Sequence, residues 1–421
     1  MEGPAEVSRP AEVEAEQAGT GISPGPIGEA ARNRLPDMTY SEQENELRSA
    51  VRSVLDDRAG FDAVLARTET PETYDTGLWR TLAAEIGCAG LLIPESLGGA
   101  GASFREAAVV AEEIGRSVAP VPFLGSAVLA TVALLTVAQD GAADDQAGQL
   151  LSDMAAGAVT AALAVPFATM PGGTVTRTVR VGMAVDGDDE GSYRLSGSVS
   201  GVAEALPADV LIVPADGVPF GLFAVRADDR GLTRTPIVSL DMTRQLCDLR
   251  LDSVQAMRIS AGPQADHAVA AAPQAGAAML AAEQLGLADR ALEITLAYVK
   301  QRYQFARPVG SFQAIKHRLA DWWVAVTQAR AASRYAAACL AEGDPDTPVA
   351  VALAKAACSD TAVLAGQEMI QLHGGIGFTW EHPAHLFLKR AKSTSIALGT
   401  ADRHRATLAR LADLPPASHV D

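Results

Sequence analysis

The stretch Gln371-Leu372-His373-Gly374-Gly375-Ile376-Gly377-Phe378 is the feature that decides the fold of this chain. Its three glycines allow a backbone turn that exposes N–H groups and lets a ligand come close to the main chain. A glycine-rich turn between helices is a weak signal by itself, so a second stretch has to be considered with it. That stretch runs from Gln301-Arg302-Tyr303-Gln304-Phe305 to Phe312-Gln313. Arg302 follows a long helical pattern, and a cation at a helix C-terminus also complements the helix dipole.

The composition limits the classes of protein that the chain can represent. A length of 421 residues allows two or three packed layers around a large core. Hydrophobic residues make up 48% of the chain and aromatic residues only 5%, which favours closely packed helices. The net charge of −17 argues against a nucleic-acid-binding protein and against binding to an anionic membrane surface. Any anionic ligand would need local arginine or lysine side chains.

The sequence predicts a cytoplasmic protein. No uninterrupted apolar run of membrane-spanning length stands out, and the N-terminus lacks the basic and apolar regions of a secretory signal. The four cysteines, Cys88, Cys247, Cys339 and Cys358, are widely spread and form no CxxC pair. We therefore expect buried free thiols and no zinc or dithiol redox centre.

Four regions follow one another along the chain. Residues 1–37 are rich in Glu, Ala, Gly and Pro, which predicts a disordered extension. Residues 38–157 show helical periodicity, and Ser41 followed by Glu44 predicts an N-cap with a capping box. Residues 158–258 hold short β-prone runs separated by Asp, Gly and Pro turns, which predicts an antiparallel β-barrel or sandwich.

Residues 259–421 return to long helical patterns, at 270–302, 311–342, 348–373 and from Pro383 to the end. They predict an Ala-rich four-helix bundle. Helices, then strands, then helices in one chain make this an α+β protein.

The motifs resemble those of the acyl-CoA dehydrogenase family. The run from Arg302 to Asp321 is similar to the family segment around its FAD pyrophosphate arginine, and the glycine stretch is similar to the second segment that grips ADP. The resemblance extends from Met38 to about Leu411 and includes Thr379-Trp380-Glu381-His382-Pro383 and Leu388-Lys389-Arg390-Ala391-Lys392. One departure is Ala306, where the family usually has glycine.

This resemblance implies an oxidoreductase that desaturates an acyl-CoA thioester with FAD. Family subunits use these two segments to hold the ADP part of a partner subunit's FAD, and electron-transferring flavoprotein accepts the electrons. The cofactor-binding residues that the resemblance implies are Arg302, Gln304, Phe305, Phe312, Gln313, Gln371, Gly374, Gly375, Gly377 and Thr400.

The catalytic base of the family is missing from the sequence. Its reaction needs a carboxylate near the α-carbon of the acyl group. Most members carry a Glu before Gly-Thr, where this chain has Leu398, and others carry it on the long helix, near Gly276 here. Neither residue can accept a proton. Glu283 is the nearest acid on that helix, and we expect it to lie at a helix contact or in solvent.

Other acids are poor substitutes for the base. Asp402 lies beyond Thr400, where the family has a cofactor-contacting or surface side chain. Glu381 follows a loop that ordinary family members also have, so we expect a structural role for it.

The flavin-ring segments of the middle region have also changed. The family's early Thr-Glu-Pro segment is replaced by a run from Ala164 to Gly173, and its later aromatic-hydroxyl segment by Ser198 to Glu204. The ADP-gripping segments are preserved while those for the chain's own flavin ring and substrate are not. We therefore predict the non-catalytic half of an α2β2 acyl-CoA dehydrogenase of actinobacterial type, which shares FAD with a related subunit.

Two alternatives remain open. One is a self-sufficient homotetrameric flavoenzyme with a non-standard base or reaction, which would hold one FAD per chain. The other is a pseudoenzyme that binds a partner or acyl-CoA without redox chemistry and holds no flavin in any complex.

Overall fold

The computed structural model describes residues 37–138, 146–175, 177–182 and 192–414. The chain divides into two compact units, Met1–Asp37 and Met38–Asp421, and only the second is described below. Apart from Asp37, the predicted disordered extension lies outside the described residues. The region boundaries proposed at residues 157 and 258 stay predictions.

The first region is helical, as predicted. Its described elements are α1 (Glu42–Arg58), α2 (Phe61–Thr68), α3 (Thr76–Arg80), η1 (Thr81–Glu85), η2 (Cys88–Gly90), η3 (Glu95–Leu97), α4 (Phe104–Ser117), η4 (Phe123–Ala130), α5 (Thr131–Ala138) and α6 (Gln146–Ala155). The predicted capping box is confirmed. The hydroxyl of Ser41 accepts a hydrogen bond from the Glu44 N–H at 3.1 Å, and the Glu44 carboxylate accepts one from the Ser41 N–H at 2.6 Å.

The middle region is a curled sheet of seven strands among the described residues. They are β1 (Ala161–Leu163), β2 (Val179–Gly182), β3 (Ser192–Ala203), β4 (Val210–Ala215), β5 (Gly221–Arg226), β6 (Leu232–Pro236) and β7 (Leu246–Ala261), ordered β1-β4-β5-β7-β3-β2 with β6 on β7. All pairs are antiparallel except β1 with β4. Asp216, just after β4, exchanges backbone hydrogen bonds with Val179 and Val181 of β2 at 2.8 and 2.9 Å. The sheet therefore curls back on itself, as the predicted barrel or sandwich would.

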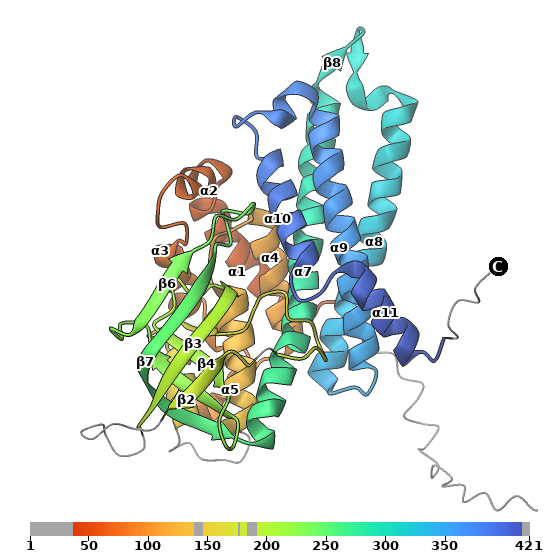
Figure 1. The fold of residues 1–421 in the computed structure, drawn as a ribbon. Helices are drawn as coiled ribbons and strands as arrows, with labels where there is room; N and C mark the ends of the chain where they lie inside the picture. Colours follow the sequence, from red (N-terminus) through yellow and green to blue (C-terminus); the bar gives the residue numbers. More distant parts are fainter. Residues whose placement is uncertain (1–36, 139–145, 176, 183–191, 415–421) are drawn as a thin grey trace, which may run out of the picture. The chain divides into compact units, whose positions relative to one another are not determined.

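The last region is the predicted helical bundle (Figure 1). It comprises α7 (Pro263–Gln301), β8 (Tyr303–Gln304), β9 (Arg307–Pro308), η5 (Val309–Ser311), α8 (Gln313–Glu342), α9 (Thr347–His373), η6 (Gly374–Phe378), α10 (Ala384–Ile396) and α11 (Ala401–Leu411). One expectation was wrong: the single helix expected after Pro383 is two helices. Leu398 and Gly399 take left-handed backbone conformations with φ of 53° and 99°, which an α-helix cannot contain.

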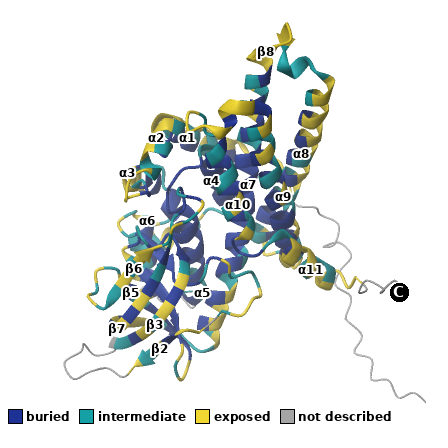
Figure 2. Ribbon diagram, turned by 45° about the horizontal axis from the view of Figure 1, so that its top comes forward, coloured by how far each residue is buried: buried dark blue, intermediate teal, exposed yellow. Residues whose placement is uncertain are grey.

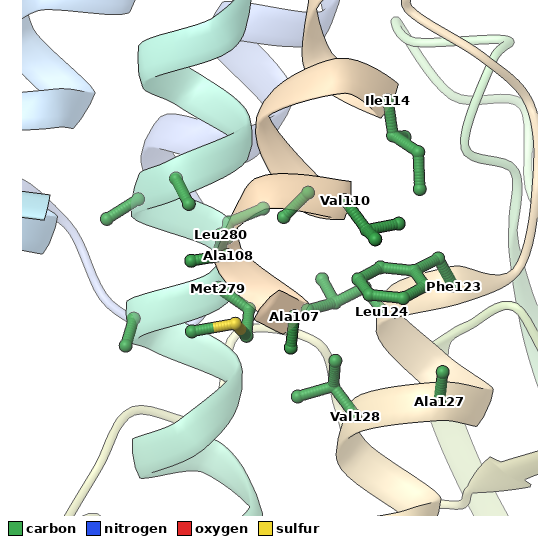
Figure 3. Close-up of a cluster of buried hydrophobic side chains, with 14 of the residues drawn as sticks. Ala107, Ala108, Val110, Ile114, Phe123, Leu124, Ala127, Val128, Met279 and Leu280 are labelled. Atoms are coloured by element: carbon green, nitrogen blue, oxygen red, sulfur yellow. The ribbon is translucent and has the colours of Figure 1, made fainter. Parts of the chain in front are cut away.

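Helix α7 joins the first region to the bundle. It packs against α4 and α5 on one side and against α8 and α9 on the other. Figure 3 shows where α7 faces α4 and η4: Met279 and Leu280 belong to the same buried hydrophobic cluster as Val110, Ile114, Phe123 and Leu124. A side chain at Gly286 would lie 1.9 Å from the Glu112 carbonyl oxygen, and one at Gly115 would lie 2.0 Å from the Glu283 carbonyl oxygen. The two helices therefore cross with their backbones in contact.

Helix α9 is the central helix of the bundle. The segment Thr347–Phe378 is long and apolar enough to span a membrane by length and composition, with a mean hydropathy of 1.4. However, 67% of its most apolar window is buried inside the fold, where α9 contacts α7, α8, α10 and α11. This is the pattern of a core helix, and it explains the apolar composition without a membrane.

The four cysteines are buried and free, as predicted. Burial raises the pKa of the Cys88 thiol to about 12 and that of Cys358 to about 12. Both thiols therefore stay protonated and unreactive at neutral pH.

Candidate functional site

The connection between α7 and α8 is a tight hairpin at one end of the bundle (Figure 1). Gln304 of β8 pairs with Arg307 of β9, and the two residues between them, Phe305 and Ala306, have φ of 54° and 60°. Two successive left-handed residues form the turn that suits a two-residue hairpin. Glycine adopts this conformation most easily, so Ala306 carries strain that a glycine at this position would not.

Arg302 lies where this hairpin leaves α7. Its N–H donates to the Tyr298 carbonyl at 2.9 Å, and its own carbonyl accepts from the Val309 N–H at 2.7 Å. Its backbone is therefore fixed while its side chain is exposed. Gln304, Phe305 and Gln313 are also exposed, and Phe305 reaches 87%. Figure 2 shows the hairpin at β8 mainly in the colour of exposed residues. Phe312 is half-buried beneath the Arg307 guanidinium, 3.9 Å from its ring centre.

The glycine turn forms η6. Its three glycines differ in the structural reason that glycine is needed at each position. Gly374 has φ of 61°, and a side chain at Gly377 would lie 2.7 Å from the Ile370 carbonyl oxygen. Gly375 has neither constraint, and a side chain there would meet no atom within 4 Å. The chain's own packing therefore does not explain Gly375, whereas the close approach of a ligand to its backbone would. The residues of this turn fit the nucleotide half of FAD.

The two predicted ADP-binding segments lie together. Tyr298, one turn before Arg302, stacks on His373 with ring centres 4.3 Å apart, and its hydroxyl donates to the His373 carbonyl at 3.3 Å. His373 directly precedes the glycine turn. Nine predicted residues are thus placed at one end of the bundle: Arg302, Gln304, Phe305, Phe312, Gln313, Gln371, Gly374, Gly375 and Gly377.

Thr400 does not join them. It is the N-cap of α11, after the C-terminal end of α10, where its side chain accepts from the Arg403 N–H at 3.4 Å. It lines a hollow of about 320 Å³ together with Asp360 and Lys392. Whether Thr400 contacts a cofactor stays a prediction.

A larger groove of about 850 Å³ adjoins this hollow and shares Lys392 with it. It lies between the sheet and the end of α10, and its lining includes Phe167, Gly201, Leu240 and Ile396. The resemblance predicts that the segments around Phe167 and Gly201 contact the flavin ring. The volume of the groove would accommodate a ring, but the expected aromatic and threonine side chains are absent from the described residues that line it.

The two positions at which the resemblance predicts a catalytic base lie side by side in the core. Leu398 is 1% exposed. A side chain placed at Gly276 would lie 3.1 Å from Leu398 Cδ1 and 2.5 Å from Leu129 Cδ2. The space that a carboxylate would need is therefore filled by two leucines. The remaining acids are elsewhere: the Asp402 side chain is 94% exposed beside Arg405, and Glu381 is exposed in a loop.

Buried polar side chains of α9 and α11 hold the loop that carries Leu398. The buried Lys355 ammonium donates to the Ser359 hydroxyl at 2.8 Å and to the carbonyls of Thr394 and Gly399 at 3.0 and 3.4 Å. The His404 ring contacts the Leu398 carbonyl at 2.8 Å, which requires a proton on its Nε2. Burial lowers the pKa of Lys355 to about 7.

Sequence reasoning missed a buried ionic network beside this core. Arg244 donates through Nε to Glu204 at 2.8 Å and through both terminal nitrogens to Glu283 at 3.0 and 2.7 Å. Arg390 Nε lies 3.0 Å from Glu283, and Arg390 also pairs with Asp241 at 3.4 Å. The five residues are at most 3% exposed. The network joins the sheet region to α7 and α10.

The pKa directions show how the carboxylates of this network behave. Burial raises the pKa of Glu204 in spite of Arg244. Burial also acts on Glu283, but Arg244 and Arg390 outweigh it and lower the pKa of Glu283. A carboxylate held by two arginines is a poor proton acceptor, so Glu283 does not replace the missing base. The signal available in the sequence was a charge within an otherwise apolar helical stretch, Ala275–Leu285.

Comparison with known families decides the identity of the fold. The acyl-CoA dehydrogenase N-terminal domain matches residues 41–158, and the acyl-CoA dehydrogenase C-terminal domain matches residues 268–412. The chain belongs to the acyl-CoA dehydrogenase family. Members of this family are FAD-dependent oxidoreductases, which confirms the expected cofactor. The order of helices, sheet and helical bundle, and the similarity to solved acyl-CoA dehydrogenase structures, confirm the predicted α+β fold class.

Several acyl-CoA dehydrogenases are similar over most of the chain. "Acyl-CoA dehydrogenase IpdE2" of Mycobacterium tuberculosis is 36% identical over 358 residues, which cover 85% of this chain and 93% of that protein. A variant of the "Tcur3481-Tcur3483 steroid ACAD" is 32% identical with a TM-score of 0.72, covering 88% of this chain and 98% of that one. The "ChsE4-ChsE5 complex" of Mycobacterium tuberculosis is 28% identical with a TM-score of 0.75, covering 90% and 100%.

Proposed function

We propose that this chain is the non-catalytic subunit of an α2β2 acyl-CoA dehydrogenase. In this complex it grips the ADP half of an FAD whose flavin ring lies on a related, catalytic subunit. The complex would introduce an α,β double bond into an acyl-CoA thioester. Electron-transferring flavoprotein is the expected electron acceptor by family resemblance.

The observation that carries the proposal is a contrast within one chain. At the end of the bundle, Arg302, Phe305 and Gln371 are exposed, and a side chain at Gly375 would meet no atom within 4 Å. In the core, both positions for the base are filled by Leu398 and Leu129 around Gly276. A chain that catalysed alone would need a carboxylate in the core. A chain that completes a neighbour's site needs only the nucleotide-binding residues at the end of the bundle.

The residues at the open end suit the nucleotide chemically. Arg302 is an exposed, permanently charged side chain on a fixed backbone, and its planar fork matches the oxygens of a pyrophosphate. Phe305 and Phe312 lie edge to face with ring centres 6.3 Å apart and offer apolar surface. When bound, FAD supplies the hydride acceptor. This chain's own residues only hold and orient it.

The relatives support a heteromeric complex and a bulky substrate. Two similar structures have names that join two different chains, and one is described as a steroid enzyme. We therefore propose a related acyl-CoA dehydrogenase subunit as the partner and a steroid-derived or similarly bulky acyl-CoA as the substrate.

The test is to produce this chain alone and together with a related subunit that carries the catalytic Glu. We expect weak FAD retention and no turnover from the chain alone, and one FAD per αβ pair with turnover from the complex. Arg302→Ala should lower FAD affinity of the complex at least tenfold, whereas Arg226→Ala, an exposed arginine of the sheet, should not. One tightly bound FAD per chain and full activity from the single chain would overturn the proposal.

A second candidate function is favoured by the groove of about 850 Å³. Its size would allow the chain to carry its own flavin in a homotetramer. In that case the isolated chain would be yellow, with one FAD per chain. A complex that contains no flavin at all would instead support a pseudoenzyme that binds a partner or acyl-CoA.

A further inference from the structure

We infer that Tyr298, His373 and His382 form a column of stacked rings that positions the glycine turn relative to Arg302. These are positioning residues for the ADP half of FAD, and the inference rests on the proposed function. Nothing in the family motifs quoted above gives Tyr298 or His382 such a role.

The geometry of the column is continuous. The rings of Tyr298 and His373 are 4.3 Å apart and inclined by 27°, and those of His373 and His382 are 4.1 Å apart and inclined by 38°. The three residues come from the last turns of α7, the end of α9 and the segment between η6 and α10. The column therefore ties together the three segments that surround the predicted nucleotide site.

His373 is the fixed middle of the column. It is 3% exposed, and its Nδ1 contacts the Met369 carbonyl one helical turn earlier at 2.7 Å, so Nδ1 carries the proton. Burial lowers the pKa of His373 and that of His382, so both rings are neutral at physiological pH. Neutral rings stack without charge repulsion, and two adjacent imidazolium ions could not.

Tyr298 connects this column to both ligand-binding segments. Its hydroxyl donates to the His373 carbonyl, directly before Gly374, and its own carbonyl accepts the Arg302 N–H that ends α7. A shift of Tyr298 would therefore move the arginine and the turn relative to each other. A misplacement of this kind weakens a ligand that contacts both segments and spares a ligand that contacts neither.

The experiment compares flavins with and without the adenylate half in the assembled complex. We measure the affinities of FAD, FMN and ADP for the apo-complex, with thermal unfolding in parallel. Tyr298→Leu removes the ring and should weaken FAD and ADP about tenfold while FMN changes less than about twofold. Tyr298→Phe keeps the stack and should recover most of the loss. Tyr193→Leu, which removes a ring that packs edge-to-face on Phe223 in the sheet, is the matched control.

The outcomes separate this inference from the proposed function. If Arg302→Ala weakens FAD but Tyr298→Leu does not, the column has no positioning role and the proposed function stands. If Tyr298→Leu weakens FAD and FMN equally and lowers the unfolding temperature, its role is only structural and the inference is overturned. If neither change affects FAD or ADP, the nucleotide does not bind at this end and the proposed function fails with it.

Discussion

Replacing Arg244 by methionine should strongly destabilise the folded chain. The guanidinium is 1% exposed and makes three short hydrogen bonds, to Glu204 at 2.8 Å and to Glu283 at 3.0 and 2.7 Å. Its removal leaves Glu204 buried without a cation, whereas Glu283 keeps Arg390 at 3.0 Å. Removing one partner of a buried ion pair costs about 3–5 kcal/mol, because the other charge stays desolvated.

The expected shift in unfolding temperature follows from the size of the unit. Unfolding entropy is roughly 2.1 cal/mol/K per residue. Over the roughly 380 residues of Met38–Asp421 this gives an entropy of about 0.8 kcal/mol/K. A loss of 3–5 kcal/mol therefore lowers the Tm by about 4–6 °C. Scanning calorimetry of the complete complex, at the same concentration for every variant, measures this shift.

Two further variants test the cause of the shift. In the triple variant Arg244→Met, Glu204→Gln, Glu283→Gln no uncompensated carboxylate remains at these positions, so most of the lost stability should return. Arg226→Met removes an arginine from an exposed pair with Asp228 and should leave the Tm unchanged. A single Arg244 variant within 1 °C of the wild type, or a triple variant no better than the single one, would refute the reasoning.

Three other predictions follow from single positions. Gly286→Ala should lower the free energy of unfolding by about 3 kcal/mol or more, because the added Cβ would lie 1.9 Å from the backbone oxygen of Glu112. An unchanged midpoint in denaturant unfolding would show that the two helices separate easily. Ala306→Gly should stabilise by about 0.5 kcal/mol, since glycine relieves a φ of 60° but loses more entropy on folding, and a lower midpoint would contradict the strained hairpin. For Lys355, burial lowers the pKa from 10.5 to about 7, so between these values the unfolded chain holds more protons than the folded one. Its contribution to stability should rise by about 1.5 kcal/mol from pH 7 to 8.5, and Lys355→Met, compared by urea unfolding at both pH values, should lack that rise.

The parts of the fold that local signals control could be predicted from the sequence. The Ser41 cap, the change from helical to alternating periodicity and the long Ala-rich helices all appear where they were expected. Strand β1 carries no such signal: it is the three-residue run Ala161–Leu163, which is buried throughout and shows no alternation of polar and apolar residues.

The features that depend on distant residues could not be predicted in the same way. Glu204 and Glu283 are 79 positions apart in the sequence, and only the folded backbone brings Arg244 between them. The left-handed conformation of Leu398 depends on its contacts as well: its N–H donates to the Phe167 carbonyl at 2.8 Å, and Lys355 holds the adjoining carbonyls. The sequence predicts the loss of the base at Leu398, but not that Leu129 lies in the same space beside Gly276.

These observations suggest how a subunit can lose catalysis and keep its fold. A vacant base site would be a cavity, and cavities cost stability in proportion to their volume. Here apolar side chains close the cavity at Gly276, while the nearby charges are paired within the network around Arg244. By contrast, Arg302, Phe305 and Gly375 are exposed, so the packing of the chain itself does not account for them. Their exposure is what the proposed role in holding a nucleotide requires.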